Sequence, residues 1–422
     1  MSADSVFASI ITIGDELLIG QTIDTNSAFI AQELNKIGVW VRRRVAVGDV
    51  YEDIKEALDE ESRESQIIII TGGLGPTADD ITKPLLCDYF GGKLVVNEEV
   101  LAHVKFLFEK IFRRPGPILE RNLKQAEVPD NCTVLFNKNG TAPGMLFERD
   151  NKIFISLPGV PHEMKGLMTD EVIPKLLEAF TMPVIAHRTA CTAGQGESMI
   201  AELLKDFEPA LPPNIKLAYL PSYGMVKLRL TAKGDNKTDL EKELNPYFDQ
   251  MLLLVKEYLV SDEDKKMEEV IGGILKEQHK TLATAESCTG GYIAHLITSI
   301  PGSSSYFNGT VVSYANEVKR NVLGVLQETL DTHGAVSEET VIQMATGVRQ
   351  KLNTDYALAT SGIMGPDGGT DEKPVGTVWI AVANAEKTET LKLNLRFGRE
   401  RNIQMTALHA LNFLRKFMLT NG

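Results

Sequence analysis

Several short segments near the C-terminus carry side chains suited to nucleophilic chemistry. Residues 284–291 read TAESCTGG, where an apolar strand runs into small polar residues and two glycines. Ser287 would lie at a helix N-terminus, whose free N–H groups can hold an oxyanion or a phosphate. A serine that only caps the helix fits the same spacing, and this alternative is favoured when the segment is considered by itself.

A hydrolytic serine also needs a base, and the histidines near it are poor candidates. His295 falls in an apolar helix, and His333 falls in a turn before a glycine. Residues 313–319, SYANEVK, place Tyr314 at the end of a strand and Lys319 about one helical turn later. A Tyr or Lys with a lowered pKa can act as a base. Taken singly, each residue equally fits an ordinary strand or surface position.

Two later segments could contact a ligand. Residues 360–369, TSGIMGPDGG, form a glycine-rich loop after the predicted strand 356–359, and such loops approach ligands closely. Residues 397–401, FGRER, precede the last predicted helix and offer an arginine that suits a phosphate. A plain surface arginine fits that position equally well.

The N-terminal part of the chain carries a second candidate site. Residues 14–18, GDELL, end the first predicted strand, and residues 24–27, DTNS, open the next helix. Residues 71–82, TGGLGPTADDIT, follow a buried strand, and their glycines would let backbone N–H groups reach a phosphate. Asp79 and Asp80 could hold a divalent cation against it. A helix N-cap with first-turn charge is the alternative, and the adjoining GGLGPT favours the functional interpretation.

The elements that would position these segments predict more than one domain. Strand-like runs at 7–13, 39–47 and 66–71 alternate with helix-like runs at 26–37 and 51–58, which predicts a parallel α/β sheet. The middle of the chain predicts a small α+β unit, with strands 184–193, 216–220 and 225–232, helix 197–207 and a helix from residue 240. The polar run SDEDKK, residues 261–266, is expected to link it to a second α/β domain. That domain is predicted from helix 267–276, strand 281–285, helix 292–300 and strand 305–314.

Bulk composition excludes several classes of protein. The 422 residues suggest two or three domains, and 43% hydrophobic with 24% charged residues is typical of a globular chain. No run of about 18 apolar residues indicates a membrane span, and the first residues do not resemble a signal peptide. Four scattered cysteines without a CxxC pair argue against a zinc site or disulfide scaffold and fit a reducing cytoplasm. The net charge of −13 disfavours nucleic-acid binding.

Taken together, TAESCTGG, YANEVK, GAVSEE, SGIMGPDGG and KPVGTVW resemble the CinA C-terminal family, whose members are nicotinamide mononucleotide amidohydrolases. Their order and spacing across about 150 residues are more specific than any single motif. The resemblance implies that Ser287 is the nucleophile, that Tyr314 and Lys319 relay its proton, and that no cofactor is needed there. The implied substrate contacts come from Thr289, Gly290, Ser361, Gly362, Gly365 and Arg399. Arg401 is the alternative to Arg399, because the chain lacks the aspartate of the family's G-D-R motif.

The N-terminal segments resemble the molybdopterin-binding MoaB/MogA-like domain as it occurs in CinA proteins. Residues 139–144, NGTAPG, and 157–164, LPGVPHEM, fit that version closely. The resemblance implies an ADP-ribose pyrophosphatase that uses a divalent metal (Mg, Mn or Co) and yields AMP and ribose 5-phosphate. The nucleotide site would comprise Gly14, Asp15, Asn26, Gly72, Gly73, Gly75, Thr77, Pro143 and Gly159. The metal ligands would be Asp79 and Asp80.

The resulting expectation is an α/β protein with three domains. These are a MoaB/MogA-like domain at 1–172, a KH-like α+β domain at 173–260 and an amidohydrolase domain at 263–422. Nicotinamide mononucleotide and ADP-ribose are the expected small-molecule partners of a cytoplasmic homodimer that binds neither membrane nor nucleic acid, since the middle unit lacks a basic GxxG loop. One alternative is a pyrophosphatase with a vestigial amidase domain. Another is a nucleotide-binding or scaffold protein linked to competence or DNA damage.

Overall fold

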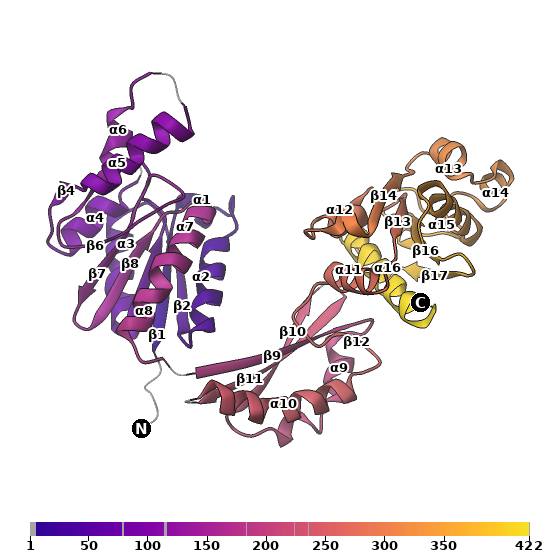
Figure 1. The fold of residues 1–422 in the computed structure, drawn as a ribbon, viewed down its shortest axis with the longest axis horizontal. Helices are drawn as coiled ribbons and strands as arrows, with labels where there is room; N and C mark the ends of the chain where they lie inside the picture. Colours follow the sequence, from indigo (N-terminus) through magenta and orange to yellow (C-terminus); the bar gives the residue numbers. More distant parts are fainter. Residues whose placement is uncertain are drawn as a thin grey trace. The chain divides into compact units, whose positions relative to one another are not determined.

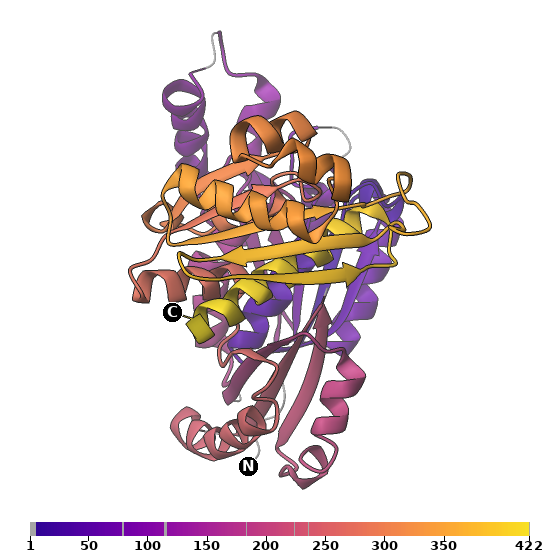
Figure 2. The same ribbon diagram turned by 90° about the vertical axis from the view of Figure 1, so that its right-hand side faces the viewer.

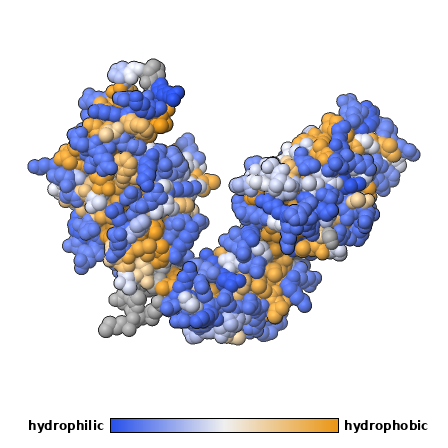
Figure 3. Space-filling model, viewed as in Figure 1, coloured by the Kyte–Doolittle hydropathy of each residue, from blue (hydrophilic) through white to orange (hydrophobic). Residues whose placement is uncertain are grey.

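The computed structural model describes residues 6–77, 80–113, 116–182, 184–222, 224–234 and 236–421. The chain divides into two compact units, and Figure 1 labels most of their elements. One unit holds the chain up to Ala186 together with Lys233–Leu240, and the other holds His187–Ala232 and the chain from Glu241 onward. Within the described ranges, no helix is long and apolar enough to cross a membrane. The face drawn in Figure 3 is mostly hydrophilic, with apolar residues interspersed.

The first unit is built on a six-stranded sheet of order β2-β1-β3-β8-β7-β6. Its strands are β1 (Phe7–Ile13), β2 (Trp40–Val47), β3 (Ile67–Thr71), β6 (Thr133–Leu135), β7 (Gly144–Arg149) and β8 (Lys152–Leu157). Its main helices are α2 (Thr25–Lys36), α3 (Tyr51–Glu64), α4 (Thr82–Tyr89), α5 (Glu98–Phe106), α7 (Pro161–Leu167) and α8 (Ile173–Ala179). Short elements complete it: α1 (Asp15–Leu18), α6 (Glu120–Leu123), and the two-stranded sheet of β4 (Leu94–Val96) and β5 (Glu127–Pro129).

The expected parallel pairing holds for β1, β2, β3 and β8, whereas β7 runs in the opposite direction and pairs antiparallel with both β8 and β6. The cause is the tight turn between β7 and β8. Asp150 and Asn151 both have positive φ, 53° and 58°, as in the two-residue hairpin turns that match the natural twist of paired strands. A chain that reverses over two residues pairs antiparallel, whereas parallel pairing needs a longer crossover.

Strand β3 shows why this unit has two cores. All five residues of its sequence IIIIT are buried, as expected for a central strand covered on both faces. Alternate side chains point to opposite faces. Ile67 and Ile69 pack in the core formed with α2, α7 and α8, whereas Ile68 and Ile70 pack in the core formed with α3 and α4. The result is a three-layer α/β arrangement.

The middle of the chain forms a four-stranded sheet of order β10-β11-β9-β12. Its elements are β9 (Val184–Ala193), α9 (Glu197–Leu203), β10 (Ile215–Ser222), β11 (Met225–Gly234), α10 (Lys237–Leu254) and β12 (Leu259–Ser261). The five predicted elements are present, although α9 ends earlier than expected and α10 begins earlier.

The last part of the chain is a second α/β structure around a five-stranded sheet of order β14-β13-β15-β16-β17. Its strands are β13 (Leu282–Glu286), β14 (Phe307–Val312), β15 (Tyr356–Gly362), β16 (Thr377–Ala383) and β17 (Thr388–Asn394). Its helices are α11 (Met267–Glu277), α12 (Tyr292–Thr298), α13 (Asn316–Leu323), α14 (Gln327–His333), α15 (Glu338–Leu352) and α16 (Arg399–Asn421). Helices α11, α12 and α16 pack in one core and α15 in another, and Figure 2 shows α16, in yellow, against this sheet.

The middle sheet and the last α/β structure share one hydrophobic core within the second unit. Cys191 and Met225 of the middle sheet belong to the same buried cluster as Met267 of α11 and Leu411 of α16. The predicted linker is also anchored, since Lys227 Nζ lies 2.5 Å from Asp264 Oδ1. Residues 261–266 therefore join two packed elements and are themselves held in place.

Candidate functional site

Ser287 lies where three strands of the C-terminal sheet end. Its backbone N–H donates to the carbonyl of Thr360 at the same end of β15, at 3.0 Å. The carbonyl of Glu286, the last residue of β13, accepts from the N–H of Ser313 beyond β14, at 2.8 Å. Because β13, β14 and β15 are parallel, their carboxyl ends lie at one edge. This edge is where α/β sheets commonly place their ligand sites.

Lys319 reaches the serine from α13. Its Nζ lies 3.0 Å from Ser287 Oγ, and it also donates to the carbonyls of Ser313, at 2.7 Å, and Tyr314, at 3.4 Å. The side chain is 1% exposed, and burial lowers the pKa of its amine. A lysine with a lowered pKa is more often neutral near neutral pH, and the neutral amine can accept the hydroxyl proton of Ser287.

A pocket of about 210 Å³ opens over this pair. It is lined by Ser287, Cys288, Tyr314, Asn316, Lys319, Ala335, Val336, Ser361, Gly362, Met364 and Arg399. The pocket therefore brings together the serine, the Tyr–Lys segment, the glycine loop and one arginine, which sequence reasoning had taken from four separate motifs. The thiol of Cys288 beside the serine is buried, and burial raises its pKa to about 12, so it stays protonated.

Arg399 spans the mouth of this pocket. Its Nη1 donates to the carbonyl of Gly365 at 2.9 Å, and its Nη2 donates to the hydroxyl of Tyr314 at 3.1 Å. Arg401 instead stacks on the ring of Phe397, with 4.1 Å from its Cζ to the ring centroid. Of the two arginines that the sequence left open, the geometry thus selects Arg399 as the pocket residue.

The structure gives Tyr314 a position that differs from the expected relay. Its side chain is 64% exposed, and its hydroxyl accepts from Arg399, whereas Lys319 makes the contact with Ser287 Oγ. Ser361 is buried at the pocket wall, where its hydroxyl donates to the carbonyl of Ala335 at 2.6 Å. Its hydroxyl therefore helps to fix the loop that holds the pocket.

Glu286 corrects the expectation that free N–H groups of the following helix face the serine. This carboxylate is fully buried, and it accepts from the N–H groups of Gly291 and Ile293, each at 3.0 Å, and of Ala294, at 2.8 Å. It satisfies the donors of the first turn of α12, so those donors cannot hold an oxyanion. Sequence reasoning missed this residue, although an acid at the end of an apolar strand, just before the glycines, was the available signal.

Thr289 and Gly290 do not line the pocket of Ser287. The hydroxyl of Thr289 donates to Glu286 Oε2 at 2.8 Å and lies 2.9 Å from that of Thr360, so its predicted substrate contact is replaced by a structural one. Thr289 and Gly290 line a neighbouring pocket of about 470 Å³ together with Tyr292 and His295. His333 pairs with Glu339, at 3.3 Å, so neither histidine that was weighed as a base lies in the pocket.

In the first unit, Asn26 connects two of the predicted segments. Its Nδ2 donates to the carbonyl of Gly159 at 2.8 Å and to the hydroxyl of Thr71 at 3.2 Å, which in turn donates to the carbonyl of Pro158. Its Oδ1 is buried without a hydrogen-bond partner among the described residues. Gly72 has φ +116°, and a Cβ there would lie 2.2 Å from the carbonyl oxygen of Ile13, so only glycine fits.

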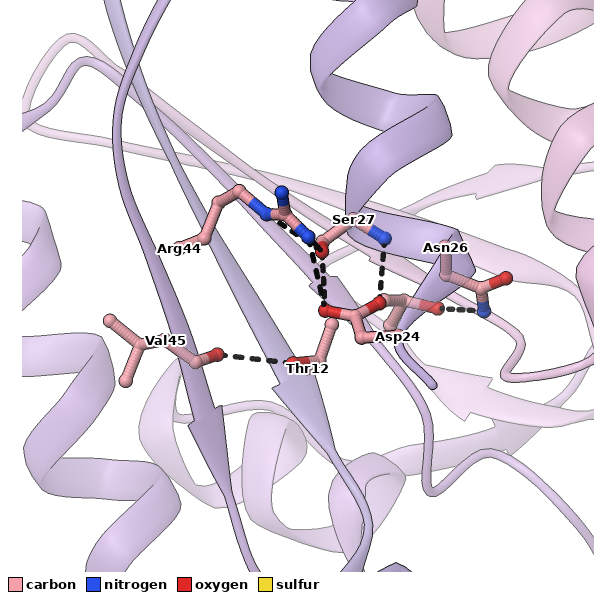
Figure 4. Close-up of polar contacts among 7 residues, drawn as sticks. Thr12, Asp24, Asn26, Ser27, Arg44 and Val45 are labelled. Carbon is pink, nitrogen blue, oxygen red and sulfur yellow. Dashed lines mark hydrogen bonds and ion pairs between the residues drawn. The ribbon is translucent and has the colours of Figure 1, made fainter. Parts of the chain in front are cut away.

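The start of α2 carries a separate polar network, shown in Figure 4. Asp24 caps the helix by accepting from the N–H of Ser27 at 2.9 Å, and Arg44 of β2 donates its Nε to the hydroxyl of Ser27 at 2.8 Å. Asp15 exchanges backbone-to-carboxylate hydrogen bonds with Asp49, at 3.1 and 3.2 Å. These contacts hold the loops near the start of α2 in place. The carboxylate of Asp15 has a structural role there, because it accepts from the backbone of Asp49.

The loop after β3 folds around Asp80. Its carboxylate accepts from the N–H of Gly75 at 2.7 Å, from the N–H of Thr77 at 2.9 Å and from the hydroxyl of Thr77. The amides that were expected to cradle a phosphate thus bind a side chain of the same loop. Gly73 closes the loop against Thr82, Gly14 donates its N–H to Val47, and Pro143 lies buried before β7.

Asp79, the other predicted metal ligand, lies outside the described residues. Among those that are described, no group of three or more His, Cys, Asp or Glu side chains could hold a metal ion. The carboxylate of Asp80 is committed to the loop. The described donors therefore do not by themselves fit a divalent cation.

Three family models match successive parts of the chain. Residues 9–178 match the "Probable molybdopterin binding domain", residues 187–260 the "Damage-inducible protein CinA KH domain" and residues 264–418 the "CinA C-terminal domain". A "CinA-like protein" of Cytophaga hutchinsonii is 51% identical over 411 residues, covering 97% of this chain and 98% of the relative. Another, from Flavobacterium psychrophilum, is 47% identical over 415 residues, covering 98% and 99%.

Among solved structures, the competence/damage inducible protein CihA from Agrobacterium tumefaciens is 38% identical, with a TM-score of 0.35, and covers 36% of this chain and 92% of its own. The relatives that span nearly the whole chain carry the conclusion. The chain belongs to the CinA family, with a MoaB/MogA-like domain, a KH domain and a CinA C-terminal domain in that order.

Proposed function

We propose that the C-terminal domain hydrolyses the carboxamide of nicotinamide mononucleotide to give nicotinate mononucleotide and ammonia. The observation that carries this proposal is the contact of 3.0 Å between Lys319 Nζ and Ser287 Oγ at the base of a pocket. A serine next to a buried lysine is an activated nucleophile that needs no histidine. The identity of the substrate is proposed from the resemblance of the five motifs to the CinA C-terminal family.

In the proposed reaction, Ser287 is the nucleophile and Lys319 transfers the protons. The neutral amine of Lys319 takes the proton of Ser287, whose oxygen bonds to the carboxamide carbon. The resulting ammonium then gives this proton to the departing nitrogen, so ammonia leaves and an acyl-serine ester remains. Water attacks the ester carbon while Lys319 takes one of its protons, the bond to Ser287 Oγ breaks, and Lys319 returns that proton to the serine. The carboxylic acid product gives its remaining proton to the solvent and leaves as nicotinate mononucleotide. The same lysine thus serves each half of the reaction.

The oxyanion needs donors other than the first turn of α12, since Glu286 occupies them. The N–H of Cys288, directly after the nucleophile in a residue that lines the same pocket, is the candidate. At the pocket mouth, Arg399 would bind the phosphate, with Tyr314 beside it.

Ammonia release from nicotinamide mononucleotide tests this proposal directly. The purified protein is expected to release ammonia and nicotinate mononucleotide in equal amounts, and Ser287→Ala is expected to abolish both. Ser299→Ala is a matched control, because that hydroxyl donates to the carbonyl of Leu296 and lies outside the pocket. Full activity of Ser287→Ala, or none in the unmodified protein, would refute the assignment.

A second proposal concerns the MoaB/MogA-like domain, which we infer cleaves ADP-ribose to AMP and ribose 5-phosphate with Mg, Mn or Co. The buried Oδ1 of Asn26, which has no partner among the described residues, supports a polar ligand at this loop. AMP formation should depend on added metal, should fall in Asn26→Leu and should persist in Ser287→Ala. AMP formation that is insensitive to metal would contradict the cofactor assignment.

The remaining alternative is a nucleotide-binding or scaffold protein with one or both sites inactive. Nucleotide binding by calorimetry without ammonia or AMP would support it, as would tight DNA binding. We also propose a homodimer, which sedimentation velocity of the intact chain would test.

A further inference from the structure

Asn402, in the first turns of α16, is a buried polar residue that no motif singled out. It is fully buried, and its amide makes three hydrogen bonds. Its Nδ2 donates to the carbonyls of Phe397, at 2.8 Å, and Met364, at 3.1 Å, and its Oδ1 accepts from the N–H of Phe397 at 3.2 Å. One side chain thus joins the segment before α16 to the glycine loop after β15.

The two segments that Asn402 joins are the ones that place Arg399. Arg399 begins α16 two residues after Phe397, and its Nη1 donates to Gly365, the residue after Met364. An arginine side chain has several rotatable bonds, so its guanidinium keeps one position only if its backbone and its acceptor are held at a fixed separation. Asn402 supplies that fixed separation from inside the core.

We infer that Asn402 is the positioning residue that sets Arg399 as the phosphate anchor of the amidase pocket. The inference rests on the proposed function, in which the substrate carries a phosphate. It deepens that function, because recognition of the phosphate would depend on an amide that touches neither the substrate nor the reacting atoms.

Only an amide meets the requirements of this position. The site presents two carbonyl acceptors and one N–H donor, and an asparagine matches them with two donors and one acceptor. In Asn402→Asp, a carboxylate oxygen would replace the Nδ2 that donates to the two carbonyls. Both of these hydrogen bonds would be lost while the size of the side chain stays the same.

The test compares Asn402→Asp and Asn402→Ala with Asn412→Asp. Asn412 is a buried asparagine of the same helix whose Oδ1 accepts from Arg415, so its replacement controls for general effects of a buried charge on α16. The readouts are kcat and KM for nicotinamide mononucleotide and the inhibition constant of ribose 5-phosphate, a fragment that carries the phosphate without the amide.

We expect the Asn402 variants to raise KM and the ribose 5-phosphate inhibition constant together, by about 10-fold or more, the size of a lost charged hydrogen bond. The kcat should stay unchanged, because binding that is equal in ground and transition states affects only KM. Asn412→Asp should leave both constants at the wild-type values. A variant that loses kcat with an unchanged KM would show a merely structural role and overturn the inference.

Calorimetry separates this inference from the proposed function. If the wild-type protein releases no ammonia, the proposed function fails, yet binding of nicotinamide mononucleotide can still be compared between wild type and Asn402→Asp. Equal affinities, or no binding to the wild type, would overturn the positioning role. Weaker binding to the variant alone would uphold it.

Discussion

Replacement of Lys319 by methionine isolates the base of the proposed reaction. Methionine keeps a linear side chain of similar length in this buried position but removes the amine that contacts Ser287 Oγ at 3.0 Å. General bases contribute about 10²- to 10⁴-fold to a rate, so kcat for ammonia release should fall by about that factor. The KM should change little, because Arg399 and the glycine loop are untouched.

The pH dependence gives a second, independent signature of Lys319. Burial lowers the pKa of its amine, and only the neutral amine can take a proton. Wild-type kcat/KM should therefore rise with pH up to this lowered pKa and then level off. The residual activity of Lys319→Met should lack that rise.

Stability should follow the same titration. The buried ammonium is disfavoured in the folded protein, so in the window between the lowered pKa and the ordinary 10.5 the unfolded chain binds more protons. The free energy of unfolding of the wild type therefore increases as pH rises through this window. Below the window, the full cost of burying the charged amine lowers the stability of the folded protein. Lys319→Met should show a smaller increase, measured by urea unfolding at several pH values.

The control is Lys351→Met, an exposed lysine of the same domain. It should retain the wild-type kcat and pH profile. The reasoning would be refuted if Lys319→Met kept wild-type kcat, or if its kcat/KM rose with pH as steeply as that of the wild type. Either result would place the base elsewhere in the pocket.

Three further predictions concern the stability of the fold. Glu286→Gln should lower the free energy of unfolding by about 1–3 kcal/mol in urea titrations, because it weakens hydrogen bonds to a charged acceptor and places an amide against N–H donors. The pKa of Lys83 is lowered from 10.5 to about 8 by burial, so the wild type should gain about 3 kcal/mol between pH 8 and 10.5. Lys83→Met should lose most of that gain, and an unchanged slope would contradict the assignment. Gly73→Ala should lower the melting temperature, because φ is +64° and a Cβ would lie 2.1 Å from Thr82 Oγ1.

Local patterns were sufficient to predict most strands of the fold. The strands at Phe7–Ile13 and Val184–Ala193 occur with the expected bounds, because their apolar periodicity is a local property. The parallel sheet of the first unit was expected throughout, and the antiparallel β7 depends on the turn at Asp150 and Asn151. Those two residues were not recognised as a hairpin turn, and they decide the direction of the strand that precedes them.

Sequence reasoning found the residues of the pocket around Ser287 that lie in motifs, but not the bonds among them. Ser287, Lys319 and Arg399 come from segments far apart in the chain, and only the shared edge of parallel strands brings them together. Asn402 was missed because its partners are the backbone groups of Met364 and Phe397. Every residue type has these backbone groups, so the sequence does not indicate which of them a side chain will bind. A buried side chain that binds backbone can be recognised only when the fold is known.

The position of Glu286 changes the source of activation for the serine. A serine at a helix N-terminus is ordinarily helped by the positive end of the helix dipole. Here a buried carboxylate accepts three N–H groups of that first turn and carries a negative charge next to the nucleophile in the chain. The helix end is thereby neutralised, which leaves the amine of Lys319 as the group that can draw the proton from Ser287. In the proposed reaction, Lys319 would therefore activate this strand-end serine without a histidine.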